Sequence, residues 1–301
     1  MTLQNFRFVH PKVIIGIPAF NEEKYIHEAL SSLSKQTWQD FVAVISDNAS
    51  TDSTKEICEH FCDNDPRFHY IRQKANIGAG QNFEYLYNIS NSPYFMWLGA
   101  HDALDPEFLS VHLSILDSNS QYVLSYSSTQ WIDESGKKTY TTQASELNTI
   151  KGTPIIRYIK SLTAICECTA VNQLIRRKAL SERFYHVIAG DHIILSSLLY
   201  RGEAYKTDQS LYKRRDFPKR ELTAMERISG LKQTKPDYQS FVDSYMKEFS
   251  LLETSFFIRT VCTPIVYWTL EDRFVKNLTK IQHKVLMIYE RIILSILSLG
   301  Y

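Results

Sequence analysis

The stretch VIIGIPAFNEE, residues 13–23, decides how the fold of this 301-residue chain is interpreted. Its β-branched start is typical of a short buried strand, and Pro18 ends the run. Polar residues follow from Asn21, and apolar residues then recur at the spacing of one helical face. These apolar positions are Tyr25, Ile26, Ala29, Leu30 and Leu33. A strand, a turn and an amphipathic helix in succession are the beginning of a βαβ unit.

The same alternation continues through the first third of the chain. Apolar runs of strand length lie at residues 41–45, 68–71 and 94–98, with helical patterns between them. We therefore expect an α/β fold with a mostly parallel sheet. Further strands are predicted at 122–126 and 130–132, and helices at 155–162, 191–200 and from about 236 onward.

Two helix starts are marked by side chains that commonly cap helices. Asp105 before Pro106 has the pattern of an N-cap followed by proline at the first helical position. Ser53 and Glu56 have the spacing of a capping box. We therefore expect helices to begin at residues 106 and 54.

Three of the apolar runs end in polar residues. They end in Phe20-Asn21-Glu22, in Asp47-Asn48 and in His101-Asp102. In open parallel sheets, ligands bind outside the carboxyl ends of the strands. The sequence therefore predicts that these three loops converge on one ligand-binding cleft.

The composition is that of an ordinary soluble globular protein, with 44% hydrophobic and 22% charged residues. A net charge of +1 argues against nucleic acid as the partner. The five cysteines have no CxxC spacing, so neither a zinc site nor a disulfide framework is expected. No secretory signal and no apolar run long enough to span a bilayer are visible. These features predict a cytoplasmic protein.

Five segments, in this order, resemble the family 2 glycosyltransferases with the GT-A fold. They are VIIGIPAFNEE, VISDNASTDST, NIGAGQNF, FMWLGAHDALDPEFL and AGDHIILSSLLYRG, and the resemblance covers roughly residues 11–216. It implies a GT-A-like, Rossmann-type mixed sheet, mostly parallel and flanked by helices. It also implies an inverting glycosyltransferase of polysaccharide biosynthesis that moves a sugar from a UDP- or dTDP-sugar to a hydroxyl of a glycan or lipid-linked acceptor.

Two other functions would each fit part of the sequence. A catalytically inactive protein that binds nucleotide-sugars is the alternative, because the family's Asp-x-Asp metal motif is altered here. A dinucleotide-dependent oxidoreductase would fit the alternation of strands and helices. However, GIPAFNEE stands where a GxGxxG fingerprint would follow the first strand.

The resemblance, together with the helical pattern that follows it, divides the chain into three parts. Residues 1–115 are expected to bind the nucleotide-sugar, residues 116–225 the acceptor, and residues 226–301 to form a C-terminal helical extension. An apolar stripe in this extension is formed by Ile281, Val285, Ile288, Ile292 and Ile296. Packing against the catalytic domain or a homodimer partner would use such a stripe. Peripheral contact with the inner face of a membrane is the other possibility.

The resemblance assigns a group of residues to the nucleotide-sugar. Asp47 would accept a hydrogen bond from the pyrimidine base, although an aspartate also commonly caps a turn. Pro18, Ala19 and Phe20 would form the floor under the nucleoside, with Glu22 close by. Asn76 and Asn82 flank a glycine turn, and Asn82 would point to the nucleotide. A plain turn with a helix cap would explain both asparagines as well.

At the fourth strand end the chain departs from the family. Gly99 and His101 stand where the two aspartates of Asp-x-Asp are expected, and Asp102 follows directly. Because Mn²⁺ and Mg²⁺ prefer oxygen ligands and Mn²⁺ also accepts imidazole, Asp102 is the expected metal ligand and His101 the second. His101 could instead only form hydrogen bonds near the nucleotide-sugar.

A third possibility at this strand end needs no metal. The cations of the basic run would then neutralise the leaving diphosphate, since guanidinium groups bind phosphate oxygens in pairs. The candidates are Lys213, Arg214 and Arg215.

The resemblance makes Asp191 the catalytic base. Inversion at an anomeric carbon needs one base opposite the leaving group, which takes the proton of the attacking hydroxyl, and a positioned carboxylate suits this task. The local sequence also predicts Asp191 as an N-cap after Gly190. The two roles are compatible, because a helix N-terminus would hold the carboxylate rigidly.

Overall fold

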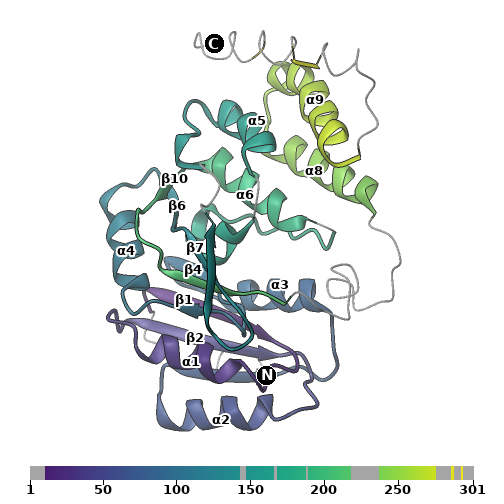
Figure 1. The fold of residues 1–301 in the computed structure, drawn as a ribbon. Coiled ribbons are helices and arrows are strands. Elements are labelled where there is room, and N and C mark those ends of the chain that lie inside the picture. The colour runs from purple at the N-terminus through teal and green to yellow at the C-terminus, as the bar shows by residue number, and fades with distance from the viewer. Residues whose placement is uncertain are drawn as a thin grey trace.

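The computed structural model describes residues 11–142, 147–165, 168–187, 189–217 and 237–275, together with 286, 287 and 293. Within these residues the N-terminal part alternates strictly between strand and helix (Figure 1). Its elements are β1 (Val13–Ala19), α1 (Ile26–Ser34), β2 (Phe41–Asp47), α2 (Thr54–Asn64), β3 (Phe68–Arg72), α3 (Ala79–Ile89) and β4 (Tyr94–Trp97). The strands predicted from the apolar runs are therefore confirmed.

The middle of the chain adds the remaining strands and the helices between them. The strands are β5 (Ala103–Leu104), β6 (Tyr122–Tyr126), β7 (Thr129–Ile132), β8 (Lys138–Thr142), β9 (Leu174–Arg176), β10 (Glu203–Lys206) and β11 (Tyr212–Arg215). The helices are α4 (Phe108–Ser118), α5 (Pro154–Ala164) and α6 (Gly190–Arg201), with 3-10 turns at Leu147–Thr149, Thr169–Asn172 and Arg177–Ala179. The helices predicted at 155–162 and 191–200 are α5 and α6.

The larger sheet has the strand order β10-β6-β9-β4-β1-β2-β3. All its neighbours pair in parallel except β9, which runs antiparallel to both β4 and β6. The expectation of a mixed, mostly parallel sheet is thus confirmed. Because β9 comes from beyond residue 115, this sheet combines strands from both of the halves proposed above.

Both faces of this sheet are buried, which explains its near-continuous apolar runs. Along β1, Val13, Ile15 and Ile17 pack towards α1, α2 and α4, whereas Ile14 packs with Leu86 of α3 on the opposite face. In Figure 1, α1 and α2 lie below β1 and β2, α4 lies to the left of the strands, and α3 lies to their right. The helices thereby fix the strand ends that carry the candidate site.

A second, smaller sheet has the order β5-β11-β7-β8. Its strand β11 runs antiparallel to β5 and parallel to β7. The pairing brings Lys213 opposite Ala103, so β11 lies beside the loop that follows β4.

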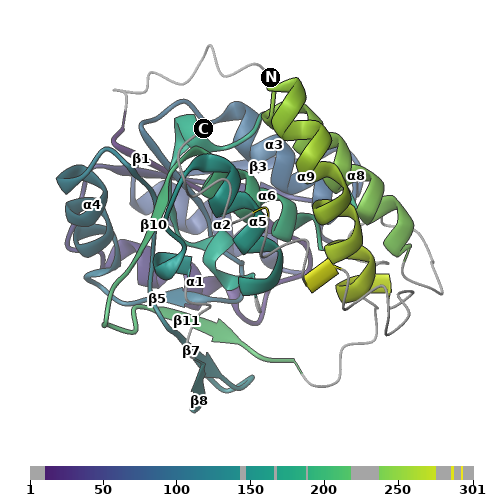
Figure 2. The same ribbon diagram turned by 90° about the horizontal axis from the view of Figure 1, so that it is seen from above.

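The last described helices are α8 (Tyr238–Leu252) and α9 (Phe256–Leu270), which continues into a π-helical turn, Glu271–Val275. Seen from above, they lie side by side along one flank of α5 and α6 (Figure 2), with which they share an apolar core. The helical extension is confirmed to this point, while the predicted stripe from Ile281 to Ile296 lies outside the described residues. No helix in the described part is both long and apolar enough to cross a membrane.

Both predicted helix starts differ in detail from the structure. Helix α4 begins at Phe108 rather than at residue 106, and Asp105 instead accepts the backbone N–H of Glu107 (3.1 Å). Helix α2 begins at Thr54 as expected, but the Ser53 side chain forms no cap bond. Asp52 takes that role by accepting the Thr54 N–H (3.1 Å).

Candidate functional site

The three polar strand ends contact one another, as the sequence predicts. Ala19 of β1 lies opposite Asp47 of β2, and the Asn48 N–H donates to the Ala19 carbonyl (2.8 Å). The third loop joins them through His101, whose Nδ1 lies 2.8 Å from Glu22 Oε1. Residues from all three loops therefore form one surface at the carboxyl edge of the sheet.

Asp47 is fully buried at the centre of this edge. Its Oδ1 accepts the Ser50 N–H (2.8 Å), and its Oδ2 accepts from Tyr70 Oη and Arg72 Nη1, both at 2.5 Å. Burial, followed by this bond to Asp47, raises the pKa of Tyr70 well above its ordinary value. The turn-capping role is thus present. The sequence did not suggest Tyr70 and Arg72 as partners of this carboxylate.

The two predicted asparagines bind the end of β2. The Asn76 amide oxygen accepts from Asn48 Nδ2 and from the Gly78 N–H, both at 2.8 Å. Gly78 has a φ of +83°, which favours glycine. Asn82 is buried, and its Nδ2 donates to the Ser46 carbonyl (2.9 Å). These bonds fix the glycine turn against β2.

The predicted nucleoside floor leaves one flat surface open. Ala19 is buried and Pro18 half-buried, whereas the Phe20 side chain is 41% exposed at the end of β1. Asn21 follows with a φ of +53°, and its Oδ1 accepts the Thr51 N–H (2.8 Å). This bond holds the turn in place, so that an aromatic ring remains exposed beside Asp47 and Glu22.

Asp102 is turned inward rather than towards this surface. Its Oδ2 accepts from Tyr212 Oη (2.8 Å) and its Oδ1 accepts the Arg215 N–H (3.0 Å), both from β11. A Cβ atom at Gly99 would lie only 2.7 Å from Asp102 Oδ2. The buried carboxylate therefore fills the space in which an aspartate side chain at position 99 would begin.

This donor set does not fit the Mn²⁺ or Mg²⁺ expected at Asp102 and His101. Both oxygens of Asp102 already accept a hydrogen bond, and His101 Nδ1 lies against Glu22. In the described ranges, no three His, Cys, Asp or Glu side chains are grouped so that they could hold a metal ion. The geometry thus gives Asp102 the position of a structural residue.

Replacing Asp102 by Ala is expected to lower the free energy of unfolding by about 1–3 kcal/mol, because Tyr212 Oη then loses its acceptor in a buried environment. Urea denaturation of the variant, of Tyr212→Phe and of the double variant measures this, and the double variant should cost less than the sum of the two. Additive losses, or a loss seen only with Mn²⁺ present, would contradict the structural role.

Asp191 lies in the first turn of α6. The N-cap is Ala189, with a φ of +55°, and its side chain makes no cap bond, so the predicted capping role of Asp191 is wrong. At Gly190 a Cβ atom would lie 2.5 Å from the Tyr185 carbonyl oxygen. Only glycine fits there, so the backbone packs tightly just before Asp191.

The surroundings of Asp191 make it a stronger base than an exposed aspartate. Desolvation by burial raises its pKa above the ordinary value. The His192 N–H (3.0 Å), the Cys168 side chain and the charge of Arg214 oppose this rise without cancelling it. A carboxylate with a raised pKa accepts a proton more readily, which suits a general base.

The basic run of β11 separates into residues with different roles. Arg215 is buried, binds Glu28, and donates to the carbonyls of His101 (3.0 Å) and Asp133 (2.6 Å), so it is a structural residue. The Lys213 side chain is half-buried and forms no hydrogen bond or ion pair with another described residue. Only Arg214 lies near Asp191.

Arg214 Nη1 donates to Thr169 Oγ1 (2.7 Å), and its guanidinium lies over the Trp131 ring, 5.1 Å from the centroid. No carboxylate in the described part of the chain forms an ion pair with it. A guanidinium held in this way keeps donors for an anionic ligand. From the sequence alone, the three cations of the run were equivalent candidates. The structure distinguishes them, because successive side chains along β11 point to opposite faces of the strand.

Comparison with known proteins connects this arrangement to glycosyl transfer. A family model described as Glycosyl transferase family 2 matches residues 14–184. An uncharacterized glycosyltransferase of Methanocaldococcus jannaschii is 30% identical over 42% of this chain and 44% of its own length. The abequosyltransferase RfbV of Salmonella typhimurium is 33% identical over 36% of this chain and 33% of its own length. The aligned segments therefore span less than half of these curated relatives.

Solved structures show the same fold. Residues 1–349 of S. aureus TarS in complex with UDP-GlcNAc align with a TM-score of 0.62 at 18% identity, over 87% of this chain and 73% of that one. A mannosyltransferase from Pyrobaculum calidifontis in complex with GDP-Man and Mn²⁺ aligns with a TM-score of 0.50 at 12% identity, over 94% of this chain and 80% of that one. These likenesses confirm the GT-A-like α/β fold expected from the sequence.

Proposed function

This chain belongs to glycosyl transferase family 2, and from that premise we propose that it is an inverting glycosyltransferase. The donor is a UDP- or dTDP-sugar, and the acceptor is a hydroxyl of a glycan or a lipid-linked sugar. The observation that carries the proposal is the meeting of the three polar strand ends at one edge of the sheet, with His101 against Glu22 and Asn48 bonded to Ala19, while Asp191 is the candidate base in the first turn of α6. The UDP-GlcNAc complex of TarS and the names of the relatives, among them a chondroitin synthase of Escherichia coli, support the substrate classes.

The donor lies at the carboxyl edge of the larger sheet in this proposal. The exposed Phe20 ring stacks against the base, and Asp47 accepts the N–H of the base in exchange for one of the hydrogen bonds that it accepts from Tyr70 and Arg72. Asn76 and Asn82 shape the turn beside the ribose. Residues 1–115 supply these groups, and residues 116–225 supply the acceptor side.

Asp191 acts as the general base. Its carboxylate takes the proton of the acceptor hydroxyl while that oxygen forms the new bond to the anomeric carbon. The nucleoside diphosphate leaves from the opposite face, which inverts the configuration. The bond from the His192 N–H to Asp191 Oδ1 supports this role, because it helps to position the carboxylate.

We assign neutralisation of the departing diphosphate to Arg214, since the residues around Asp102 do not fit a metal. The guanidinium binds phosphate oxygens in pairs and stabilises the charge that develops on them. Arg214 is supported by its place between Thr169 and Trp131, near Asp191.

Calorimetric titration with UDP and dTDP, each with and without Mn²⁺, tests this function. We expect binding of at least one nucleotide, with an affinity that Mn²⁺ leaves nearly unchanged. No binding of either nucleotide would contradict the proposal. Binding without transfer of a sugar to any of a panel of glycan acceptors would favour the alternative, an inactive nucleotide-sugar-binding protein.

A further inference from the structure

The end of α8 and the start of α9 carry the most exposed large apolar side chains in the described part of the chain. Phe256 is 76% exposed, Phe257 70% and Leu251 48%. Apolar side chains that are exposed together on a folded surface mark a contact with a partner or a lipid. We call these three side chains the apolar tip.

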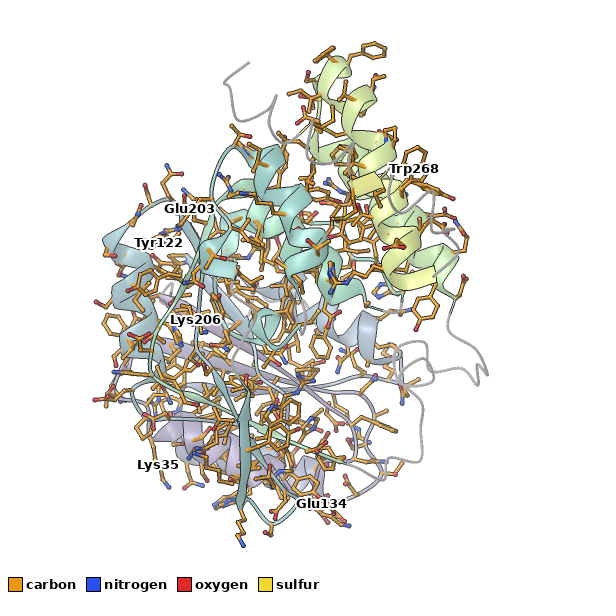
Figure 3. All side chains as sticks on the ribbon, turned by 45° about the horizontal axis from the view of Figure 1, so that its top comes forward. Lys35, Tyr122, Glu134, Glu203, Lys206 and Trp268 are labelled. Carbon is orange, nitrogen blue, oxygen red and sulfur yellow. The ribbon has the colours of Figure 1, made fainter. Side chains whose placement is uncertain are left out.

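The opposite side of α9 is firmly packed, which explains why the tip faces outward. Cys262, Ile265 and Val266 are buried in the core that α9 shares with α5 and α8. The outer side carries Trp268, which points away from the helix in Figure 3. Because the buried face of α9 is packed against α5 and α8, Phe256 and Phe257 are held at the surface.

In residues 244–262, which include the apolar tip, both charged side chains at the surface are positive. Lys247 is exposed and Arg259 half-exposed, whereas the only carboxylates between residues 244 and 262 are buried. Of these, Glu248 accepts from Arg183 Nε (2.8 Å) and Glu253 from Tyr200 Oη (3.1 Å). Both carboxylates bond to groups inside the protein, so the surface charges of this stretch are those of Lys247 and Arg259.

The other end of α9 has the opposite character. A hydrogen bond from Tyr267 to Glu271, together with the charge of that carboxylate and of Asp243, raises the pKa of Tyr267. Asp243 is exposed there and Asp272 half-exposed. The two ends of the α9 surface therefore differ in sign, although both carry exposed aromatic rings.

We propose that the apolar tip inserts into the surface of an anionic membrane, with Lys247 and Arg259 contacting the lipid headgroups. Aromatic and leucine side chains next to basic residues are the combination that binds such surfaces. Three partly exposed side chains offer roughly 300–400 Å² of apolar area, about half of what each partner buries in a standard protein interface. The area suits shallow insertion better than a second copy of the chain.

Flotation of the whole protein with vesicles tests this contact. Vesicles of phosphatidylcholine alone are compared with vesicles that also contain phosphatidylglycerol, at low and high salt. The wild type should bind the anionic vesicles and lose binding at high salt, because the headgroup contacts are screened. Replacing Phe256 and Phe257 by Ser should weaken partition by about tenfold. Trp268→Ser, which removes an exposed ring from the acidic end, should leave it unchanged.

Three results would overturn the proposal. They are equal partition of the wild type onto both kinds of vesicle, equal partition of wild type and the double variant, and a loss in Trp268→Ser as large as in the double variant. A dimer in sedimentation that the double variant abolishes would assign the tip to a second copy. Calorimetric UDP affinity serves as the folding control, because it should not change in any of these variants.

Discussion

Asp191→Asn is expected to reduce kcat by about 10²- to 10⁴-fold while the affinity for the nucleotide changes little. The amide keeps the size and one acceptor oxygen of the carboxylate, so the bond from the His192 N–H can remain. It cannot take a proton from the acceptor hydroxyl. Steady-state rates and calorimetric UDP affinities, measured on the same preparations, separate chemistry from binding.

The pH dependence gives an independent check on this base. Asp191 works only when ionised, and burial raises its pKa, so kcat/KM should fall as the pH drops through this raised value and reach a plateau above it. The acid limb should therefore lie above the range of an ordinary aspartate. Asp208→Asn, which changes an exposed carboxylate between β10 and β11, should keep both rate and profile. Equal losses of rate and of UDP affinity in Asp191→Asn would remove Asp191 from the role of base.

Arg214→Met is expected to weaken UDP binding by about 10- to 100-fold and to leave the binding of uridine unchanged. Hydrogen bonds to charged groups contribute about 1.5–3 kcal/mol, and uridine lacks the diphosphate that would receive them. Methionine retains much of the apolar stem that packs on Trp131. Titrations with UDP and with uridine locate the lost interaction on the phosphates.

Lys213→Met is the matched control for Arg214. It removes one positive charge from the neighbouring position of β11, whose side chain points to the opposite face of the strand. We expect no more than a twofold change in UDP affinity, because only a diffuse charge is lost. Equal losses in both variants would indicate that Arg214 acts through the net charge of the strand. Equal losses for UDP and uridine in Arg214→Met would indicate a structural role instead.

The sequence was sufficient to predict the strands and helices that are indicated by patterns among neighbouring residues. The apolar runs of β1, β2 and β4 and the amphipathic spacing of α1 follow from neighbouring residues, and the polar residues behind the strands predicted where the candidate site lies. The helix starts were less predictable. Asp52 and Ser53 are both able to cap α2, and a tertiary contact decides between them, since the Ser53 N–H donates to Glu23 Oε2 (3.0 Å).

The roles of Asp102 and Arg214 could not be predicted from the sequence. Asp102 receives its partners from Tyr212 and Arg215, about 110 residues later, and no local pattern records such a pairing. The same is true of Arg214, because its position depends on Trp131 and Thr169, which belong to separate segments. A motif that departs from its family therefore needs the tertiary contacts before its role can be assigned.

The position of β11 between β5 and β7 has a consequence for biosynthesis. During synthesis the loop from Gly99 to Asp102 emerges from the ribosome long before Tyr212 and Arg215, the two residues that satisfy its buried carboxylate. Until then the loop lacks these packing partners, because contacts of high sequence separation form late. The packing around Asp102 is thus completed only after β11 has been translated.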